Sequence, residues 1–486
     1  MNNEISKLEP VSLWENFYAL TQIPRPSKKE KKAADYIVEF GKNLGLETLV
    51  DDIGNVIIKK PATPGMENRK TVVLQGHIDM VPQKNSDKVH DFEKDPIETH
   101  IEDGWVTANG TTLGADNGIG VAAAMTVLQS KKIQHGPIEA LFTIDEETGM
   151  TGAFGLKPGL LAADILLNMD SEDEGELYVG CAGGSNANMT FDYKEVETNT
   201  NTVAFKISLT GLKGGHSGMD IVLGRGNANK LMFRLLKEVI AAYGVRLSSI
   251  DGGSLRNAIP REAFAIVTVP SNNVIEFTET IEEFAKIYQN ELAATEPSLS
   301  LMAEKCEMPS SLIDELSQDD LVNAIQACPN GVIRMSDSMK GLVETSLNLA
   351  IVKSEDKKIS VMCLIRGSVD SAKEDVESTL ESLFRLAGAQ VEFSGQYPGW
   401  KPNPQSEILT VMKEVYHKEY GKTPAIKGIH AGLECGILGA AYPNWDMISF
   451  GPTIRSPHSP DEKVNIETVE KFWHFLVETL KNIPTK

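Results

Sequence analysis

The stretch Thr71-Val72-Val73-Leu74-Gln75-Gly76-His77-Ile78-Asp79 decides the fold, because an apolar run ends there in side chains that can bind metal. Its short apolar start predicts a buried strand over 71–75. Outward from it, the chain predicts further strands at 55–59, 138–144 and 164–169, and helices at 13–21, 27–44 and 118–129. In the helix at 27–44, Ser27 and Glu30 have the spacing of a capping box. Helices that alternate with short apolar strands indicate an α/β sheet with both faces covered.

Three of the predicted strands end beside side chains that suit metal binding or acid–base chemistry. His77, the pair Glu146-Glu147 and Asp170 each lie at or just beyond the carboxyl end of a strand. Open α/β sheets bind their ligands at this edge. Asp79 follows His77 by two positions and points to the same side if the strand continues that far. In the alternative interpretation, Glu146-Glu147 is a solvated pair of acids and Asp170 begins an exposed acidic run.

Two further residues, distant in the sequence, complete a candidate metal site. Asp116 lies in a glycine-rich segment, and His458 appears near the end of the chain. With the residues above they supply two histidines and three carboxylates, which are enough ligands for a pair of divalent ions. Asp79 and Glu146 would remain for proton chemistry. The alternative for Asp116 is a simple turn, because Asn117-Gly118 is a turn dipeptide.

Length and composition exclude several classes of protein. At 486 residues the chain exceeds a single core, so two or three domains are expected. The net charge of −21 argues against a nucleic acid or an anionic membrane as partner, and no apolar stretch reaches the ~18 residues of a membrane helix. The start of the chain lacks the basic and apolar regions of a signal peptide. The five cysteines are scattered, as expected of reduced, mostly buried thiols in the cytoplasm.

The pattern of elements changes in the middle of the chain. Alternating β-like runs with helical segments fill residues 186–399, and the alternation of helix and strand resumes from about 400. We therefore predict one catalytic domain over 1–185 and 400–486, interrupted by an inserted domain over 186–399. Two parts of the insertion, Ser254–Val269 and Thr345–Ile365, look loosely alike, although chance explains so weak a similarity nearly as well.

Taken together, these motifs resemble those of the co-catalytic zinc peptidases over essentially the whole chain. The family includes carnosinases, glutamate carboxypeptidase, acylases and succinyl-diaminopimelate desuccinylase. The matching motifs, in the family's order and approximate spacing, are His77-Ile78-Asp79, Gly114-Ala115-Asp116-Asn117, Asp145-Glu146-Glu147-Thr148-Gly149, Asn168-Met169-Asp170 and the late His458. In the insertion, Lys213-Gly214-Gly215-His216-Ser217-Gly218 resembles the family's lid-domain histidine motif. The resemblance implies an α/β fold, with a mixed central sheet flanked by helices and an inserted α+β lid domain.

Within this family, the chain is similar to the bacterial aminoacyl-histidine dipeptidase branch. The similarity lies in its length, the Asp116-Asn117 pair and the segment 429–436. One departure is Gly432-Leu433-Glu434, where many relatives have Gly-Thr-Asp, and it leaves the role of Glu434 open.

The resemblance implies two divalent metal ions per chain. It assigns His77 and Asp170 to one ion, Glu147 and His458 to the other, and Asp116 to both as a bridge. Oxygen and imidazole ligands without thiolate suit Zn²⁺ and also admit Mn²⁺ or Co²⁺. A cis peptide bond between Asp116 and Asn117 is implied as well.

Further roles follow from the same resemblance. Asp79 would orient the imidazole of His77, and Glu146 would act as the general base. In the lid domain, His216 would stabilise an oxyanion, and Asn257 and Arg366 would bind substrate. The alternatives are a turn histidine at 216 and an exposed arginine at the end of a strand at 366.

The leading functional hypothesis is a cytoplasmic metallodipeptidase that cleaves Xaa-His and related short dipeptides. In the same chemical class, the alternatives are an N-acyl-amino-acid amidohydrolase and a tripeptide aminopeptidase. A non-catalytic metal-binding or peptide-binding homologue is the alternative from a different class, and Glu146 argues against it, since a pure binder needs no base. The expected partner is a short peptide, with no nucleic acid and no membrane. A homodimer is compatible with the sequence, although a lid domain this long could supply His216 to the active site of its own chain.

Overall fold

The structure is a computed structural model that describes residues 4–486. It contains two compact units, which we call the first unit and the inserted unit. The first unit consists of the described residues up to Gly180, Pro402–Gly428 and Leu433–Lys486, and the inserted unit of Cys181–Lys401 and Ile429–Gly432.

These limits differ from the predicted domains at one segment of functional interest. The prediction assigned all of 400–486 to the catalytic domain, whereas the structure groups Ile429–Gly432 with the inserted unit. The backbone explains this grouping, because the N–H of Ala182 donates to the carbonyls of Ile429 and Ala431 at 3.1 and 3.0 Å. His430 is thereby placed among residues of the insertion.

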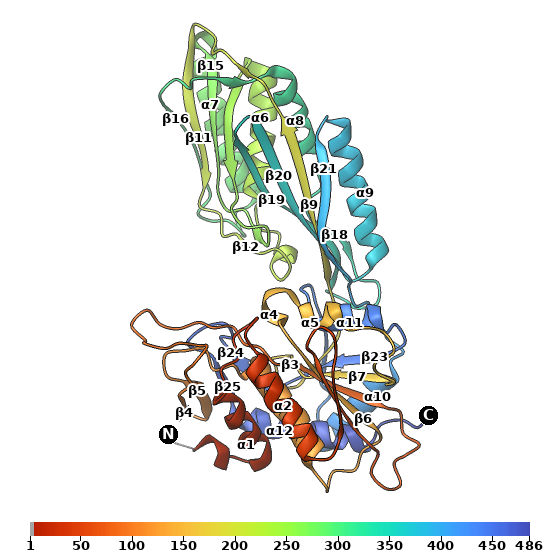
Figure 1. The fold of residues 1–486 in the computed structure, drawn as a ribbon. Helices are drawn as coiled ribbons and strands as arrows, with labels where there is room; N and C mark the ends of the chain where they lie inside the picture. The colour runs from red at the N-terminus through yellow and green to blue at the C-terminus, as the bar shows by residue number, and fades with distance from the viewer. Residues whose placement is uncertain (1–3) are drawn as a thin grey trace. The chain divides into compact units, whose positions relative to one another are not determined.

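The first unit contains an eight-stranded sheet of order β1-β2-β6-β3-β7-β23-β8-β22 (Figure 1). Its strands are β1 (Glu47–Val50), β2 (Val56–Lys60), β3 (Val72–His77), β6 (Ile138–Thr143), β7 (Ile165–Asn168), β8 (Glu176–Cys181), β22 (Ala425–Ile429) and β23 (Asp446–Ser449). β3 runs parallel to β6 and β7, and β7 to β23, while β1 and β2 form an antiparallel edge. This is the mixed sheet that the resemblance implied.

Both faces of the central strands are covered. Every residue of β3, β6 and β7 is buried, so side chains of both faces lie against other parts of the unit. The surrounding helices are α1 (Val11–Thr21), α2 (Lys31–Asn43), α3 (Ala115–Gln129), α4 (Glu146–Gly149), α5 (Thr151–Gly155), α10 (Glu407–Tyr420), α11 (Glu434–Ala441) and α12 (Ile466–Lys481), with a 3-10 turn at Ile5–Lys7. A small sheet of order β24-β25-β5-β4 comprises Ile454–Arg455, Lys463–Asn465, Trp105–Ala108 and Thr99–Glu102.

The parallel register brings the ends of the three central strands together. His77 pairs with Thr143, and Gln75 pairs with Asn168. The residues that follow β3, β6 and β7 therefore leave the sheet at one edge, as the sequence analysis predicted for the candidate site.

The capping box predicted for the second helix is wrong. α2 begins at Lys31, and Ser27 lies before it in a segment bound to the chain that follows β3. The hydroxyl of Ser27 donates to Asp79 Oδ2 at 2.8 Å, and its N–H donates to the carbonyl of Met80 at 3.3 Å. Because these bonds hold Ser27 at Asp79, it cannot cap the helix.

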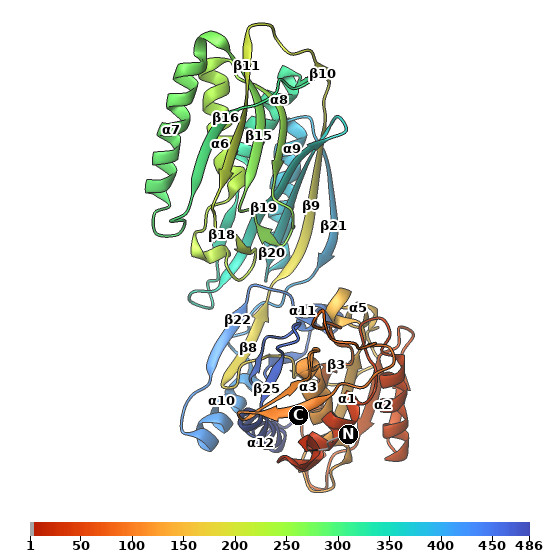
Figure 2. The same cartoon turned by 90° about the vertical axis from the view of Figure 1, so that its left-hand side faces the viewer.

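The inserted unit is a nine-stranded antiparallel sheet of order β16-β11-β15-β13-β19-β20-β9-β21, with β18 paired to β19 (Figure 2). The strands are β9 (Gly183–Asp192), β11 (Thr202–Thr210), β13 (Arg246–Gly252), β15 (Ala263–Pro270), β16 (Ser300–Lys305), β18 (Gly331–Met335), β19 (Val343–Glu355), β20 (Lys358–Gly367) and β21 (Gln390–Tyr397). Its helices are α6 (Ala228–Tyr243), α7 (Val274–Glu291), α8 (Glu315–Ala327) and α9 (Asp370–Leu386), and short pairs are β10 (Glu195–Val196) with β17 (Leu312–Ile313) and β12 (Gly215–His216) with β14 (Ala258–Ile259).

Two copies of one motif make up this large sheet. β11-α6-β13-β15-α7-β16 and β9-α8-β19-β20-α9-β21 are both β-α-β-β-α-β units, joined where β13 pairs with β19. Each copy shows the same strand order within the sheet, with its first strand between its third and fourth strands. The structural repeat agrees with the likeness of the two sequence segments only in part. The apolar strands β15 and β20 correspond, but the counterpart of β19 is β13, which precedes Ser254–Val269, and Asn257 lies in a turn.

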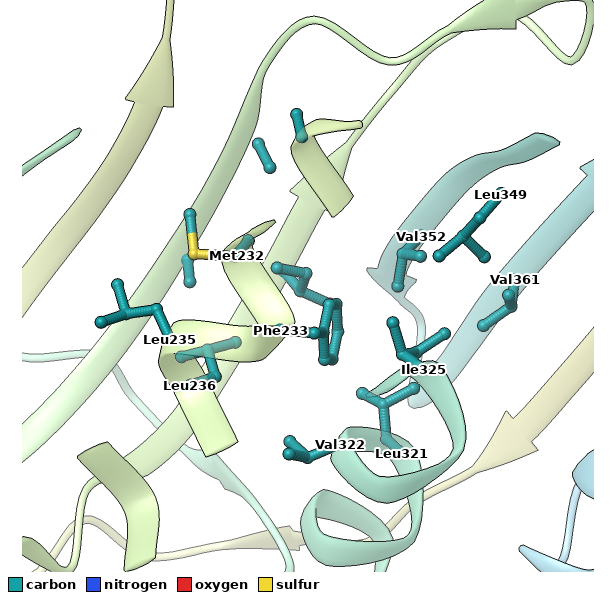
Figure 3. Close-up of a cluster of buried hydrophobic side chains, with 14 of the residues drawn as sticks. Met232, Phe233, Leu235, Leu236, Leu321, Val322, Ile325, Leu349, Val352 and Val361 are labelled. Atoms are coloured by element: carbon teal, nitrogen blue, oxygen red, sulfur yellow. The ribbon is translucent and has the colours of Figure 1, made fainter. Parts of the chain in front are cut away.

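The core of the inserted unit lies between the sheet and its helices. Figure 3 shows apolar side chains of α6 and α8 facing those of β19 and β20. They include Met232, Phe233, Leu236, Leu321, Ile325, Leu349, Val352 and Val361, all of which are buried. This burial of aliphatic and aromatic side chains stabilises the unit by about 1.5–3 kcal/mol per large side chain.

Two predictions from composition can be compared with the structure. Four of the five cysteines are buried, as expected. None of the helices within residues 4–486 is both long and apolar enough to span a lipid bilayer.

Candidate metal centre

His77 is the last residue of β3, and its ring faces two carboxylates. Its Nε2 lies 3.0 Å from Asp116 Oδ1 and 3.3 Å from Asp170 Oδ1. The glycine before it is required by packing, since a Cβ on Gly76 would lie 2.3 Å from Asn117 Oδ1. The close approach of α3 to β3 at this glycine sets Asp116 beside His77.

The start of α3 holds Asp116 and Asp170 together. The peptide bond between Asp116 and Asn117 is cis, as the resemblance implied. The amide of Asn117 donates to the carbonyl of Met169 at 2.7 Å and also to the carboxylate of Asp170. Asn117 therefore orients one candidate ligand while its neighbour Asp116 supplies another.

His458 approaches the opposite oxygen of Asp116. His458 Nε2 lies 3.3 Å from Asp116 Oδ2 and 2.9 Å from Glu147 Oε2. Three overlapping groups of side chains have ligand atoms within 4.8 Å of one another: His77 with Asp116 and Asp170, His77 with Glu146 and Glu147, and Asp116 with Glu147 and His458. Asp116 belongs to the first and the last of these groups, and each of its oxygens faces a different histidine.

The electrostatics of these groups favour a cation. The hydrogen bonds of His458 to Asp116 and Glu147 raise the pKa of His458 to about 11. Burial by itself would raise the pKa of Asp116, but its hydrogen bonds with His458 and His77 hold that pKa well below its ordinary value. Glu147 Oε1 is buried without a hydrogen-bond partner among the described residues. Two imidazoles, three carboxylates and this unpaired oxygen suit one or two divalent ions.

Asp79 links the end of β3 to the acidic pair. His77 Nδ1 lies 3.2 Å from the carbonyl oxygen of Asp79 and 3.4 Å from its carboxylate Oδ1. The same carboxylate accepts the N–H groups of Glu146 and Glu147 at 3.0 and 3.3 Å. Burial disfavours its charge, but the bonds from His77, Glu146 and Ser27 outweigh burial and lower the pKa of Asp79 to about 2. Asp79 therefore positions α4 as well as the imidazole.

Glu146 has the electrostatic environment of a proton-transfer group. Burial, with the negative charges of Asp170, Glu434 and Glu147, raises the pKa of Glu146 well above its ordinary value, against the opposing influence of His77. A carboxyl group whose proton affinity is raised in this way suits general base and acid chemistry near neutral pH.

Glu434, whose role the sequence left open, lies beneath this site. It is fully buried and accepts hydrogen bonds from Gln75 Nε2 at 2.6 Å and Thr143 Oγ1 at 2.8 Å. Gln75 also accepts from Asn168 Nδ2 at 2.5 Å. Burial raises the pKa of Glu434 to about 7. Through this network the side chain of Glu434 connects β3, β6 and β7 at residues that precede the candidate ligands. Glu434 therefore helps to hold the ends of these strands in place.

The inserted unit brings His216 and Arg366 together. The Arg366 guanidinium lies 3.3 Å from Ser217 Oγ, 3.3 Å from the hydroxyl of Tyr397 and 3.5 Å from His216 Nε2. Arg366 is buried, so the alternative of an exposed arginine is wrong. His216 Nδ1 accepts the N–H of Met219 at 3.0 Å, and burial together with the charge of Arg366 lowers the pKa of His216. A neutral His216 then carries its proton on Nε2 and can donate it in a hydrogen bond.

Asn257 is close to this cluster only through its backbone. Its carbonyl accepts the N–H of Ser217 at 2.9 Å, next to the pairing of β12 with β14. Its side chain is exposed. Its proposed contact with substrate is not tested by these bonds.

His430 is a further member of the cluster that the sequence analysis missed. Its Nε2 lies 2.7 Å from Ser346 Oγ, and its carbonyl would be 2.1 Å from a Cβ on Gly218. Burial, with the nearby charge of Arg366, lowers the pKa of His430 from 6.5 to about 3.

This depressed pKa predicts a loss of stability in acid. The unfolded chain takes up a proton on His430 near pH 6.5, whereas the folded chain does not, so the stabilisation is complete above 6.5 and is lost as the pH falls toward 3. Between pH 7 and 5 the loss amounts to about 2 kcal/mol. We expect the stability gap between wild type and His430→Gln to shrink by that amount in urea unfolding. A gap that is equal at both pH values would contradict the assignment, and His474→Gln, at an exposed histidine, controls for removal of an imidazole.

Comparison with known proteins identifies the family of the chain. Residues 73–482 match the model of peptidase family M20/M25/M40. Cytosol non-specific dipeptidase of Escherichia coli (strain K12) is 50% identical over 486 residues, which is 100% of both chains. The crystal structure of aminoacylhistidine dipeptidase from Vibrio alginolyticus has a TM-score of 0.96 and 53% identity, and covers 99% of this chain and 98% of that one.

A more distant structure shares the fold alone. Aminopeptidase PepT from Bacillus cereus ATCC 10987 has a TM-score of 0.57 at 17% identity, over 98% of this chain and 99% of its own. The family match extends from β3 to the last helix and includes every candidate ligand described above. The chain is thus a member of peptidase family M20/M25/M40.

Proposed function

We propose that this chain is a dinuclear metallodipeptidase that hydrolyses Xaa-His and related short dipeptides. The observation that carries the proposal is the carboxylate of Asp116, whose two oxygens face His77 and His458 beside the Glu146-Glu147 pair. The relatives named above, a non-specific dipeptidase and an aminoacylhistidine dipeptidase, support the substrate class.

The proposed metal ligands fall into two sets that share one member. His77 and Asp170 would hold one ion, Glu147 and His458 the other, and Asp116 both. Zn²⁺ is the proposed metal, and Mn²⁺ and Co²⁺ are compatible with the same ligands. When bound, such ions polarise the scissile carbonyl and lower the pKa of water.

Glu146 would then act on protons at both stages of hydrolysis. Its carboxylate takes a proton from the attacking water and passes it to the leaving amine, for which a raised pKa is suitable. Asp79 fixes the backbone of Glu146 through the 3.0 Å bond to its N–H. The carboxylate is therefore delivered from a short helix whose position is set by the same residue that orients His77.

Two groups of the inserted unit would bind the substrate. His216, neutral and with its Nε2 proton available, would donate to the oxyanion that forms at the scissile carbonyl. Arg366 would bind the terminal carboxylate of the dipeptide through paired N–H groups. Asn257 is the remaining substrate-binding candidate, and its exposed side chain is free to contact a ligand.

A substrate panel with and without chelator tests this function. We expect metal-dependent cleavage of Xaa-His and other dipeptides, with slower cleavage of N-acyl amino acids and tripeptides. Preference for an acyl amino acid would favour the amidohydrolase alternative, and preference for a tripeptide the aminopeptidase alternative. No turnover with two bound ions would favour a non-catalytic binding protein. Native mass determination would test the homodimer, and fractionation of cells the proposed cytoplasmic location.

Arg366→Lys should raise the KM for free dipeptides by about 10–100-fold, because it retains the charge but loses the forked pair of donors. A dipeptide amide has no carboxylate, so we expect wild type to cleave it poorly and the substitution to change its KM little. Arg256→Lys is the matched control, since Arg256 lies in the same unit and donates to the carbonyls of Ala187 and Cys363. Equal cleavage of amide and free acid by wild type would rule out a carboxylate contact.

A further inference from the structure

Glu462 is a buried carboxylate that binds a row of backbone N–H groups. Its Oε2 accepts from Leu113 and Gly114 at 2.7 and 2.9 Å, and its Oε1 from Ala115 and Asp116 at 2.7 and 3.3 Å. It lies four positions after His458, on the loop that carries that histidine. One side chain therefore joins the loop of Asp116 to the loop of His458.

Arg25 is a buried guanidinium that binds carbonyl groups of the same region. It donates to the carbonyls of Ile78 and Asp79 at 2.7 and 3.0 Å and to that of Gly114 at 2.5 Å. Burial lowers the pKa of Arg25, and the negative charge of Glu462 opposes this shift, followed by those of Asp79 and Asp116. Arg25 therefore joins the loop of His77 to the loop of Asp116.

Gly114 is held from both sides by these residues. Glu462 accepts its N–H and Arg25 donates to its carbonyl, so both polar groups of this residue are bound to buried side chains of opposite charge. A Cβ on Gly114 would lie 2.6 Å from Arg25 Nη2, and one on Gly118 would lie 2.7 Å from the same atom. The glycines of this segment leave room for the guanidinium.

We propose that Glu462 and Arg25 are positioning residues of the metal centre, which set the distances from Asp116 to His77 and to His458. The inference rests on the proposed metal centre. Neither residue is a proposed ligand, and both are buried away from solvent. Their effect is through the backbone: the loop that carries the shared ligand is fixed to the two loops that carry the histidines.

A carboxylate is the chemical group that this role requires. Ionised glutamate only accepts hydrogen bonds, so it can accept all four N–H groups at once. Glutamine would keep one oxygen and place an NH₂ donor against the N–H groups that the other oxygen now accepts. Such unsatisfied buried donors are costly, and the loop would have to move away from the side chain.

The test compares Zn²⁺ binding by the full-length, metal-stripped chain in calorimetric titrations. Wild type is expected to bind two ions, and Glu462→Gln to bind at least one of them ten to one hundred times more weakly, the usual effect of residues behind metal ligands. Glu139→Gln is the matched control. Glu139 is also buried and accepts a backbone N–H, that of Ala162 at 2.9 Å, but it lies at the opposite end of β6 from the site.

The control separates positioning from general destabilisation. Both glutamine variants should lower the Tm, but only Glu462→Gln should weaken Zn²⁺ binding. Wild-type affinity in Glu462→Gln, or an equal loss in Glu139→Gln, would overturn the inference. If Glu462→Gln does not fold, Arg25→Lys decides. Arg25 uses two nitrogens, Nη1 for the carbonyls of Ile78 and Asp79 and Nη2 for that of Gly114, and the single nitrogen of lysine cannot occupy both positions. Weaker binding therefore supports the inference, and unchanged binding refutes it. Fewer than two ions in wild type would instead refute the metal centre itself, and the inference with it.

Discussion

Glu146→Gln is expected to lower kcat by about 10²–10⁴-fold, the usual contribution of a general base, while two metal ions stay bound. Glutamine keeps the shape of the side chain but cannot take a proton from water. The backbone of residue 146 should keep its place, because its N–H bond to Asp79 does not depend on the side chain. Steady-state kinetics and metal analysis of the same preparation measure the two quantities.

A matched control distinguishes loss of the base from loss of another carboxyl group near the site. Glu172 is partly buried, and burial together with the negative charges of Asp116 and Asp170 raises its pKa to about 8. Near neutral pH Glu172 is therefore largely protonated, so Glu172→Gln replaces a carboxyl group near the site without removing the proposed base, and its effect on kcat should stay below about tenfold. Near-normal kcat in Glu146→Gln with two bound ions would remove Glu146 from the mechanism.

The candidate site was predictable where the chemistry follows directly from strand ends. His77, Glu146 and Asp170 stand at the ends of parallel strands, and parallel strands bring their carboxyl ends to one edge. For these three residues, an apolar run followed by a polar residue is enough to predict a position at that edge. Asp116 and His458 follow no strand of the large sheet, so they were candidates only as residue types that can bind metal, and their assignment to particular ions came from the resemblance.

The supporting residues could not be predicted in this way, because their partners are distant backbone groups. Arg25 lies between two prolines and resembles a break in a helix, and Glu462 lies among charged and proline residues that resemble a solvated loop. The most distant partner of Arg25 lies 89 positions away in the sequence, and that of Glu462 lies 349 positions away. Ser27 was assigned to a helix cap because local spacing allowed it, whereas Asp79 offered a better acceptor. Tertiary hydrogen bonds overrode the local pattern.

The inserted unit shows the same division between local and distant information. Alternating strands and a loose internal likeness were visible in the sequence. The two β-α-β-β-α-β copies are recognised only from strand order, and strand order is set by pairing across the whole unit. His430 illustrates the consequence, because its contact with Ser346 and the bonds of Ala182 to its neighbours, all distant in sequence, place it with the insertion.

The shared position of Asp116 predicts an asymmetry among the metal ligands. Asp116→Ala removes the one carboxylate that faces both histidines, so it should weaken both ions, by at least about 100-fold for one of them. Of the two histidines, the carboxylate of Asp170 faces only His77. Asp170→Ala should therefore weaken the ion at His77, and the ion at His458 should remain tightly bound. Metal content after dialysis and calorimetric titration with Zn²⁺ measure the difference between these variants.

Asp116→Asn tests the same bridging role with a smaller change in side-chain volume. Asparagine keeps an oxygen toward only one of the two histidines, so the second ion should be weakened even though the loop is still held by Glu462 through backbone N–H groups. Because that backbone contact survives in every Asp116 variant, a loss of metal can be assigned to the carboxylate and not to a displaced loop. Two tightly bound ions in Asp116→Ala, or equal losses in Asp116→Ala and Asp170→Ala, would refute a bridging carboxylate and leave two independent metal sites.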